Sequence, residues 1–325
     1  MKAVPMSPFW KFATVEKKPT RDGYGQALLE LGETNPDVVV LTADLAESTR
    51  ALPFGQKYPD RFIECGVAEQ NMMGVAAGLA LAGKIPFVSS YAVFSPGRNW
   101  DQLRVSVCYS KANVKIAGAH TGVSVGPDGA THQALEDMAI TRVIPDLIVI
   151  APCDAEETRK CTLAAAAHKG PVYFRFAREK TPIMTVKETQ FEIGKAYVCR
   201  EGYDVTLVAC GPLLHAALMA SETLAAQGIE AEVINCHTIK PLDEKTLLAS
   251  FKKTRCAVTV EEHQIIGGLH GAVAEMSVKN FPINIKAVGM PDSFGESGEP
   301  DELLAKYGMT AAHIVKAAKQ AMQRK

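Results

Sequence analysis

Residues 62–83, FIECGVAEQNMMGVAAGLALAG, place a short apolar run directly before a long segment rich in glycine and alanine. The first part, FIECGV (62–67), has the composition of a strand, and the second is expected to form a helix from about Gln70 to Ala82. A strand that leads into a helix is the repeating unit of α/β domains. Sites in such domains form at the carboxyl edge of the sheet, so the residues between these two elements are candidates for chemistry.

Strand-like and helix-like segments alternate along the whole sequence. Further strands are expected at 38–44, 85–91, 114–119, 147–152, 171–177, 204–210, 230–236, 257–262 and 283–290. Helices are expected near 100–109, 213–227, 243–250 and 300–323, with another that begins at Asp154. Apolar strands separated by helices predict an α/β fold of two consecutive doubly wound domains with mostly parallel sheets.

A polar stretch from Arg178 to Phe191, which contains Pro182, separates the two sets of elements. Proline and a cluster of polar residues are typical of a connection between units. The expected organisation is a loose N-terminal arm (1–19), a first domain (20–180), a linker (181–192) and a second domain (193–325).

The composition argues against several classes of protein. The formal net charge is -1, and no basic stripe with interleaved aromatics is present, so nothing favours nucleic-acid binding. The longest nearly uncharged run, residues 71–83, is too short to cross a membrane. The cysteines are scattered without a C-x-x-C pair, as is typical of reduced core thiols in a cytoplasmic protein. No G-x-G-x-x-G, Walker A or G-x-S-x-G motif occurs, so nucleotide-binding and serine-hydrolase functions lack support.

The loop after the expected strand at 62–67 carries Glu69, a lone carboxylate between an apolar strand and an apolar helix. In the simpler interpretation, this acid lies in the first turn of the helix and is stabilised by the helix dipole. In the other interpretation, it is a desolvated carboxylate suited to proton transfer.

Two further loops carry unusual residues. Tyr91 and Phe94 are three residues apart, and they are either core residues or a platform for a flat heteroaromatic ring. His120, Asp128 and His132 share a loop that is expected to be accessible. A zinc site is one interpretation of these residue types, but proton transfer or recognition of a substrate hydroxyl fits the spacing better.

Together and in this order, the three loops resemble the transketolase group of thiamine-diphosphate enzymes, and the resemblance runs from about Pro19 to the C-terminus. The most specific stretch is AHTGVSVGPDGATHQALED (119–137). GVAEQ (66–70) is shared with related synthases and with the β subunits of 2-oxo-acid dehydrogenases. VINCHTIKPLD (233–243) and TVEEHQIIGG (259–268) are similar to the C-terminal domain of the same superfamily.

The resemblance implies one subunit of a split, two-chain transketolase, consisting of the pyrimidine-binding and C-terminal domains. Members of the group bind the diphosphate and Mg2+ through a G-D-G…N motif, and this sequence has no G-D-G. A partner chain with that motif would hold Mg2+ or Ca2+, and an α2β2 heterotetramer is the expected assembly. The implied reaction transfers a two-carbon ketol unit from a ketose phosphate to an aldose, as in pentose phosphate metabolism.

The resemblance also assigns roles to individual residues. Glu69 matches the glutamate that hydrogen-bonds the pyrimidine N1′, and Tyr91 and Phe94 match aromatics that pack on that ring. His120 and His132 match histidines that contact substrate hydroxyls, with His132 assigned to proton transfer. The other matches are Asp128 for a substrate hydroxyl, Asp44 and Val67 for the cofactor, and Arg21, Ser48 and Arg178 for the sugar phosphate.

The sequence departs from the family pattern at Gln70, where His is usual, at Pro127, where an acid is common, and around Arg98, where a further aromatic is expected.

Three other functions stay open: a β subunit of a 2-oxo-acid dehydrogenase, a carboligase like 1-deoxyxylulose-5-phosphate synthase, and a non-enzymatic scaffold or regulatory paralogue. The D-G-A-T-H-Q tract favours the transketolase over the dehydrogenase, and retention of the acid and the histidines argues against the scaffold. His263 and His270 are expected to be structural or interfacial.

Overall fold

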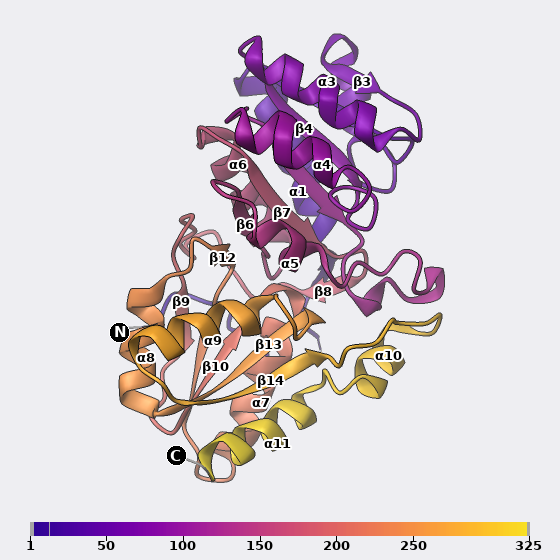
Figure 1. Cartoon of the computed structure of the whole chain (residues 1–325). Coiled ribbons are helices and arrows are strands. Elements are labelled where there is room, and N and C mark those ends of the chain that lie inside the picture. Colours follow the sequence, from indigo (N-terminus) through magenta and orange to yellow (C-terminus); the bar gives the residue numbers. More distant parts are fainter. Residues whose placement is uncertain (1–2, 13, 324–325) are drawn as a thin grey trace.

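The computed structural model describes residues 3–12 and 14–323, which form two α/β domains joined side by side (Figure 1). The sheet of the first domain has seven strands in the order β12-β6-β7-β5-β4-β2-β3. Its parallel strands are β2 (Val38–Thr42), β3 (Phe62–Glu64), β4 (Ile85–Tyr91), β5 (Lys115–Ala119), β6 (Ile148–Ile150) and β7 (Val172–Phe176). The expected α/β fold with mostly parallel sheets is confirmed.

Helices cover both faces of the first sheet, which explains why its strands are continuous apolar runs. Successive side chains of β4 point to opposite faces, so Phe87 joins one buried cluster and Val88 joins the other. The Phe87 face packs against α1 (Thr20–Thr34) and α6 (Ala155–Ala167). The Val88 face is covered by α3 (Glu69–Leu81), by the short α4 (Trp100–Gln102) and by the π-helix η2 (Leu103–Tyr109).

The second domain is built on a five-stranded sheet in the order β14-β13-β10-β11-β9. Its strands are β9 (Tyr197–Arg200), β10 (Val205–Ala209), β11 (Ala231–Asn235), β13 (Cys256–Gln264) and β14 (Asn284–Met290), and only β9 runs antiparallel to its neighbour. The helices are α7 (Leu214–Ala225), α8 (Glu244–Thr254), α9 (Leu269–Asn280), α10 (Pro300–Lys306) and α11 (Ala311–Met322).

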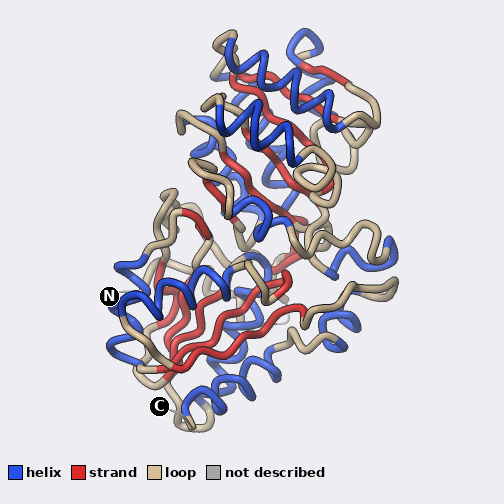
Figure 2. Tube along the Cα trace, viewed as in Figure 1, coloured by secondary structure: helices blue, strands red, loops and turns tan. Residues whose placement is uncertain are grey.

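The two domains are linked more closely than the sequence indicates. Strand β12 (Thr238–Lys240) belongs to the second half of the chain, yet it pairs antiparallel with β6 at the edge of the first sheet. One buried cluster also contains residues of both domains, with Val149 from the first and Ile239 and Leu247 from the second. The remaining short elements are α2 (Leu52–Lys57), η1 (Pro59–Arg61), η3 (Val123–Asp128), α5 (Asp137–Arg142) and η4 (Gly211–Leu213). Figure 2 shows how helices, strands and loops are distributed over the two domains.

The described residues of the N-terminal arm expected at 1–19 are held in place and are not loose. The amide of Val4 donates to the carbonyl of Val198 at 2.9 Å, and the amide of Ser7 donates to that of Met184 at 2.8 Å. Met6 and Trp10 pack against the apolar cluster of the second domain, and burial of these side chains stabilises the arm on that surface. The arm then forms β1 (Lys17–Pro19), which pairs antiparallel with β8 (Lys180–Pro182). Residues 1, 2 and 13 of the expected arm lie outside the described residues, and the boundaries at 180 and 193 stay predictions.

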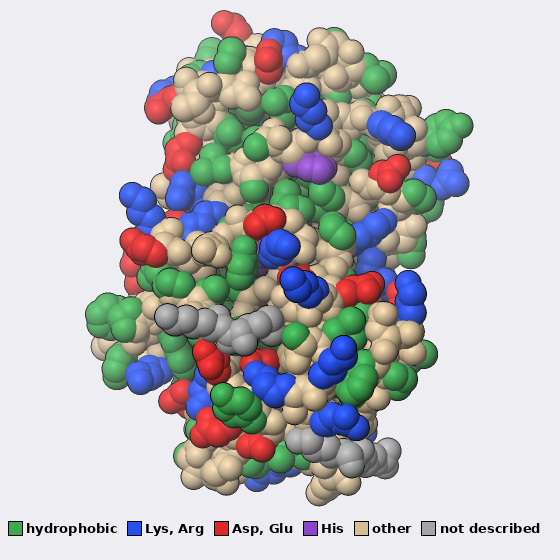
Figure 3. Space-filling model, turned by 90° about the vertical axis from the view of Figure 1, so that its left-hand side faces the viewer, with side chains coloured by type: hydrophobic (Ala, Val, Ile, Leu, Met, Phe, Trp, Pro, Cys, Tyr) green, Lys and Arg blue, Asp and Glu red, His purple; other side chains and the backbone are tan. Residues whose placement is uncertain are grey.

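The surface carries both signs of charge. Lysine and arginine side chains are interspersed with aspartate and glutamate over the face shown in Figure 3, in keeping with a formal net charge of -1. Within the described part of the chain, no helix is both long enough and apolar enough to span a bilayer.

Asp154 fixes the start of α6 and the segment that leaves the first domain. Its side chain caps the helix by accepting from the amide of Glu157 at 2.8 Å, and it also accepts from the amides of Met184 and Thr185 at 2.8 and 2.7 Å. The carboxylate is fully buried. Asp154→Ala should therefore lower the free energy of unfolding by about 3 kcal/mol, because a cap is lost and buried amides are left without acceptors.

Urea unfolding followed by circular dichroism measures this loss. Glu188→Gln, which changes an exposed acid in the same segment, serves as the control and should stay within about 0.5 kcal/mol of the wild type. An Asp154→Ala midpoint equal to that of the control would contradict the assignment.

Candidate active site

Four neighbouring parallel strands end at one edge of the first sheet and bring the three loops together. Strands β3, β2, β4 and β5 are adjacent in that order. Asp44 follows β2, Glu69 lies five residues beyond the end of β3, Tyr91 ends β4 and His120 follows β5. Because the carboxyl ends of parallel strands share an edge, residues far apart in sequence meet there.

Two aromatic side chains and two histidines form a compact cluster at this edge. The Tyr91 and His120 rings stack with centroids 3.7 Å apart. Tyr91 and Phe94 are nearly parallel, with centroids 6.0 Å apart and planes 16° from each other. The His132 ring meets both aromatics edge-on, at 6.0 Å from Tyr91 and 5.6 Å from Phe94. The structure thus brings together four of the residues singled out in the sequence.

Glu69 lies in the first turn of α3, as the simpler interpretation expected, and its side chain is also desolvated, with 1% exposed. Its Oε2 accepts from Nη1 of Arg98 at 2.6 Å. The Arg98 guanidinium also lies over the Phe94 ring, 4.8 Å from its centroid. Asn99 donates to the backbone carbonyl of Glu69 at 3.2 Å, which fixes the turn from the other side. The sequence marked Arg98 only as a departure from the family pattern.

His120 is held in an unusual state. Its backbone adopts φ +56°, its side chain is buried, and its Nδ1 has no hydrogen-bond partner within the described structure. Burial, followed by the nearby positive charges of Arg21 and Arg178, lowers its pKa to about 3. The imidazole is therefore neutral near pH 7, and it can donate from one ring nitrogen and accept at the other.

His132 and Asp128 lie at the outer end of the same loop. His132 is half-buried, and its Nδ1 is 2.8 Å from the hydroxyl oxygen of Thr131. Asp128 ends η3, and its side chain is exposed. Both histidine rings contact Tyr91, but the ring of His120 is buried whereas that of His132 is more accessible.

The three residues assigned to a sugar phosphate lie around this loop. Nη1 of Arg21 donates to the carbonyl oxygen of Ser48 at 2.9 Å, and Nη1 of Arg178 donates to that of Val125 at 2.8 Å. Arg50, which the sequence did not single out, is a further positive charge that lowers the pKa of His120. Its Nε is 2.7 Å from the Asp22 carboxylate.

Asp44 and Val67 stand on the exposed rim. The amides of Asp44 and Gly66 both donate to Oε1 of Glu64 at 2.8 Å, which ties the loops after β2 and β3 together. Val67 has 70% of its surface exposed, next in sequence to the turn that buries Glu69.

The donor set fits a flat, nitrogen-containing aromatic ring. A buried carboxylate can hydrogen-bond a ring nitrogen, and the parallel Tyr91 and Phe94 rings offer a stacking surface. No group of three or more His, Cys, Asp or Glu side chains that could hold a metal ion occurs among residues 3–12 and 14–323. No disulfide joins the cysteines in the same part of the chain.

Comparisons with known proteins agree with this architecture. The family model "Transketolase, pyrimidine binding domain" matches residues 16–184, and "Transketolase, C-terminal domain" matches residues 194–314. The chain is 44% identical over 305 residues to the 6-deoxy-6-sulfo-D-fructose transketolase subunit of Clostridium sp. (strain MSTE9), covering 94% of this chain and 95% of that protein. It is 36% identical over 299 residues to an apulose-4-phosphate transketolase subunit of Phocaeicola vulgatus, covering 92% and 96%.

Among solved structures, one described as "Split gene transketolase, inactive beta4 tetramer" is similar with a TM-score of 0.87 and 46% sequence identity. The match covers 94% of this chain and 99% of that chain.

The pKa of His120 makes a prediction about acid stability. The folded state holds this ring neutral down to about pH 3, whereas the unfolded chain takes up a proton near pH 6.5. The unfolded state therefore binds more protons between these values, so stability falls as pH falls through that window. His120→Phe, which keeps a ring against Tyr91, should make the loss shallower by about 1.4 kcal/mol per pH unit at most. Urea midpoints measured from pH 4 to pH 7 test this, and identical slopes for variant and wild type would contradict it.

Proposed function

Because the chain belongs to the transketolase family, we propose that it is the pyrimidine-binding and C-terminal subunit of a two-chain, thiamine-diphosphate-dependent transketolase. In this proposal the enzyme transfers a two-carbon ketol unit from a ketose phosphate to an aldose acceptor. The observation that supports it most is the buried Glu69 carboxylate at the same sheet edge as the cluster of Tyr91, Phe94, His120 and His132.

The cofactor's aminopyrimidine would be held by residues of the first domain. Glu69 would hydrogen-bond the ring nitrogen N1′, and Tyr91 and Phe94 would pack on the ring. Asp44 and Val67 would lie at the rim where the partner chain closes the site. When bound, thiamine diphosphate supplies the carbanion that carries the two-carbon unit, and the protein contributes orientation and control of protons.

The remaining residues are assigned to the sugars. The neutral, buried ring of His120 would bind a substrate hydroxyl, and the more accessible His132 would transfer protons. Asp128 would accept a hydrogen bond from a further hydroxyl. Arg21, Ser48 and Arg178 form the proposed phosphate site, because a guanidinium pair suits the geometry and charge of a phosphate dianion.

A partner chain is proposed to complete the enzyme. The sequence contains no G-D-G motif, and two relatives are named as transketolase subunits. The similar solved structure is described as an inactive β4 tetramer, which is what a subunit without its partner would give. We place the diphosphate and its Mg2+ or Ca2+ on the partner, in an α2β2 assembly in the cytoplasm.

A reconstitution assay tests the function. Purified chain is mixed with thiamine diphosphate, Mg2+, xylulose 5-phosphate and ribose 5-phosphate, with and without a second chain that carries G-D-G…N. Ketol transfer is expected only in the mixture of both chains. A parallel arm with pyruvate and glyceraldehyde 3-phosphate separates the carboligase alternative. Turnover by this chain alone would contradict the partner requirement, and turnover of pyruvate instead of the ketose would contradict the transferase assignment.

Glu69→Ala should lower kcat of the reconstituted enzyme by a factor on the order of 1,000, because the carboxylate controls a proton at the cofactor. The variant should keep the circular dichroism spectrum of the wild type. Glu33→Ala is the matched control, since it removes an acid from a surface ion pair with Lys57 and should leave kcat unchanged. Near-normal activity of Glu69→Ala would remove this residue from the catalytic assignment.

A further inference from the structure

The loop that carries His120, Asp128 and His132 is held from outside its own domain. The amide of Ser124, in the middle of this loop, donates to Oε1 of Glu262 at 2.7 Å. Glu262 lies on β13 of the second domain, and both residues are buried. A carboxylate that accepts from a backbone amide makes a strong, charge-assisted hydrogen bond.

The close approach of Glu262 restricts which residue can occupy position 122 of the loop. Gly122 has φ +86°, and a Cβ at this position would collide with the Glu262 carboxylate. A side chain at residue 122 is therefore disfavoured both by the backbone conformation and by the glutamate. The second domain thus occupies space that an ordinary residue of the loop would fill.

The other end of the loop is tied to the second domain as well. Nε2 of Gln133 donates to the carbonyl of Glu296 at 2.9 Å and to that of Val123, within the loop, at 3.1 Å. The amide of Gln264, two residues after Glu262, donates to the carbonyl of Leu135 at 2.9 Å. Contacts at 124, 133 and 135 therefore bracket Asp128 and His132.

The contacts of Glu262, Gln133 and Gln264 between the loop and the second domain are called the clamp below. A buried arginine joins this clamp to the first sheet. Nη1 of Arg175, on β7, donates to the carbonyl of Glu262 at 3.1 Å, and its Nη2 donates to that of Ala134 at 3.2 Å. The backbone of Glu262 is thereby fixed to the sheet while its side chain reaches the loop. The carboxylate is positioned by both domains at once.

From these contacts we infer that Glu262 is a positioning residue, through which the second domain sets the geometry of the loop that binds the sugar substrates. The inference rests on the proposed function for its substrates, but the clamp itself is a property of the chain. It gives the second domain a role in the chemistry although Glu262 does not touch the pyrimidine-binding residues Glu69, Tyr91 and Phe94.

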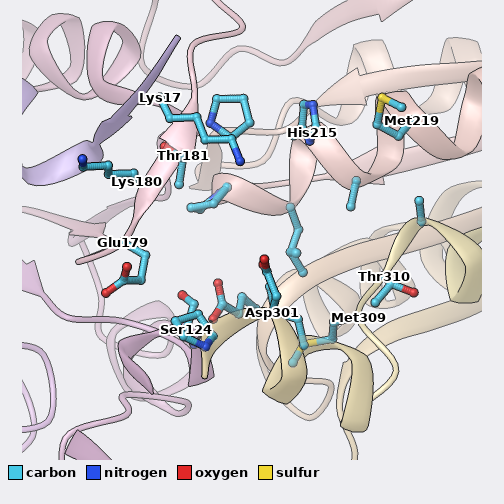
Figure 4. Close-up of a pocket in the computed structure, with 18 residues that line it drawn as sticks. Lys17, Ser124, Glu179, Lys180, Thr181, His215, Met219, Asp301, Met309 and Thr310 are labelled. Carbon is cyan, nitrogen blue, oxygen red and sulfur yellow. Dashed lines mark hydrogen bonds between the residues drawn. The ribbon is translucent and has the colours of Figure 1, made fainter. Parts of the chain in front are cut away.

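An interdomain cavity of about 390 Å3 borders the clamp (Figure 4). Ser124 and Glu262 form part of its wall, together with Asp301 from α10 and His215 from α7. Space beside the carboxylate means that its side chain can be replaced without rebuilding a fully packed core. Asp301 offers a matched control, because it is an acid in the same cavity that lies on another element.

The experiment compares Glu262→Met, Glu262→Gln and Asp301→Asn in the full chain. Hydrogen exchange of the chain alone reports the loop directly. The Ser124 amide should exchange about tenfold faster in Glu262→Met and about threefold faster in Glu262→Gln, because a neutral amide is a weaker acceptor than a carboxylate. Asp301→Asn should exchange like the wild type.

In the reconstituted enzyme, Glu262→Met should raise KM for the ketose phosphate about tenfold while the Kd for thiamine diphosphate stays unchanged. In Glu262→Gln, KM for the ketose phosphate should lie close to the wild-type value. Exchange and KM equal to those of the wild type in Glu262→Met would overturn the inference, and so would a parallel loss of cofactor affinity, which indicates a merely structural role.

Two outcomes distinguish a failure of the inferred role of Glu262 from a failure of the proposed function. If Glu262→Met does not fold, wild-type exchange of Ser124 in Glu262→Gln overturns the clamp and faster exchange supports it. If the wild-type complex shows no ketol transfer, the proposed function fails, whereas the exchange rates still decide whether Glu262 holds the loop.

Discussion

Arg175 carries a buried positive charge that the rest of the structure must neutralise. Only 6% of this residue is exposed, and a guanidinium in such surroundings is costly unless it is paired and its donors are satisfied. Asp137 supplies the negative charge at 2.9 Å, and it also accepts from the hydroxyl of Tyr173 at 2.6 Å. The carbonyls of Glu262 and Ala134 accept from its Nη1 and Nη2 at 3.1 and 3.2 Å. Since these partners come from the start of α5, from the loop before it and from the second domain, satisfying one charge on β7 fixes three parts of the molecule relative to one another.

Most of the fold could be predicted from local patterns, because its strands are buried on both faces and read as continuous apolar runs. The segment VVVLT at 38–42 and the run at 85–91 are examples, and both form central strands. The elements that the sequence did not predict are short or depend on distant partners. Strand β12 has three residues, and its existence depends on the edge of β6. The arm at the N-terminus holds its place through contacts with Val198 and Met184, which no local periodicity reveals.

The site was predictable in part for a similar reason. Glu69, Tyr91 and His120 each follow or end a parallel strand, so recognising the strands was enough to bring these residues to one edge. Arg98 and Glu262 were missed because their contacts join residues 29 and 138 positions apart. A sequence shows that a buried carboxylate needs a partner, but it does not show which of the many arginines supplies it. The one local signal at the loop was Gly122, whose lack of a side chain makes room for Glu262.

Strand β12 has a consequence for how the chain can be divided or built. It gives β6 its outer neighbour, so that the sheet of the first domain is finished by a segment made much later in the chain. Until residues 238–240 emerge, the nascent first domain exposes a row of unpaired amides and carbonyls along β6, the kind of edge to which other chains add by strand pairing. An excised first domain would keep that edge permanently and be prone to aggregate, whereas the intact chain closes it with its own backbone.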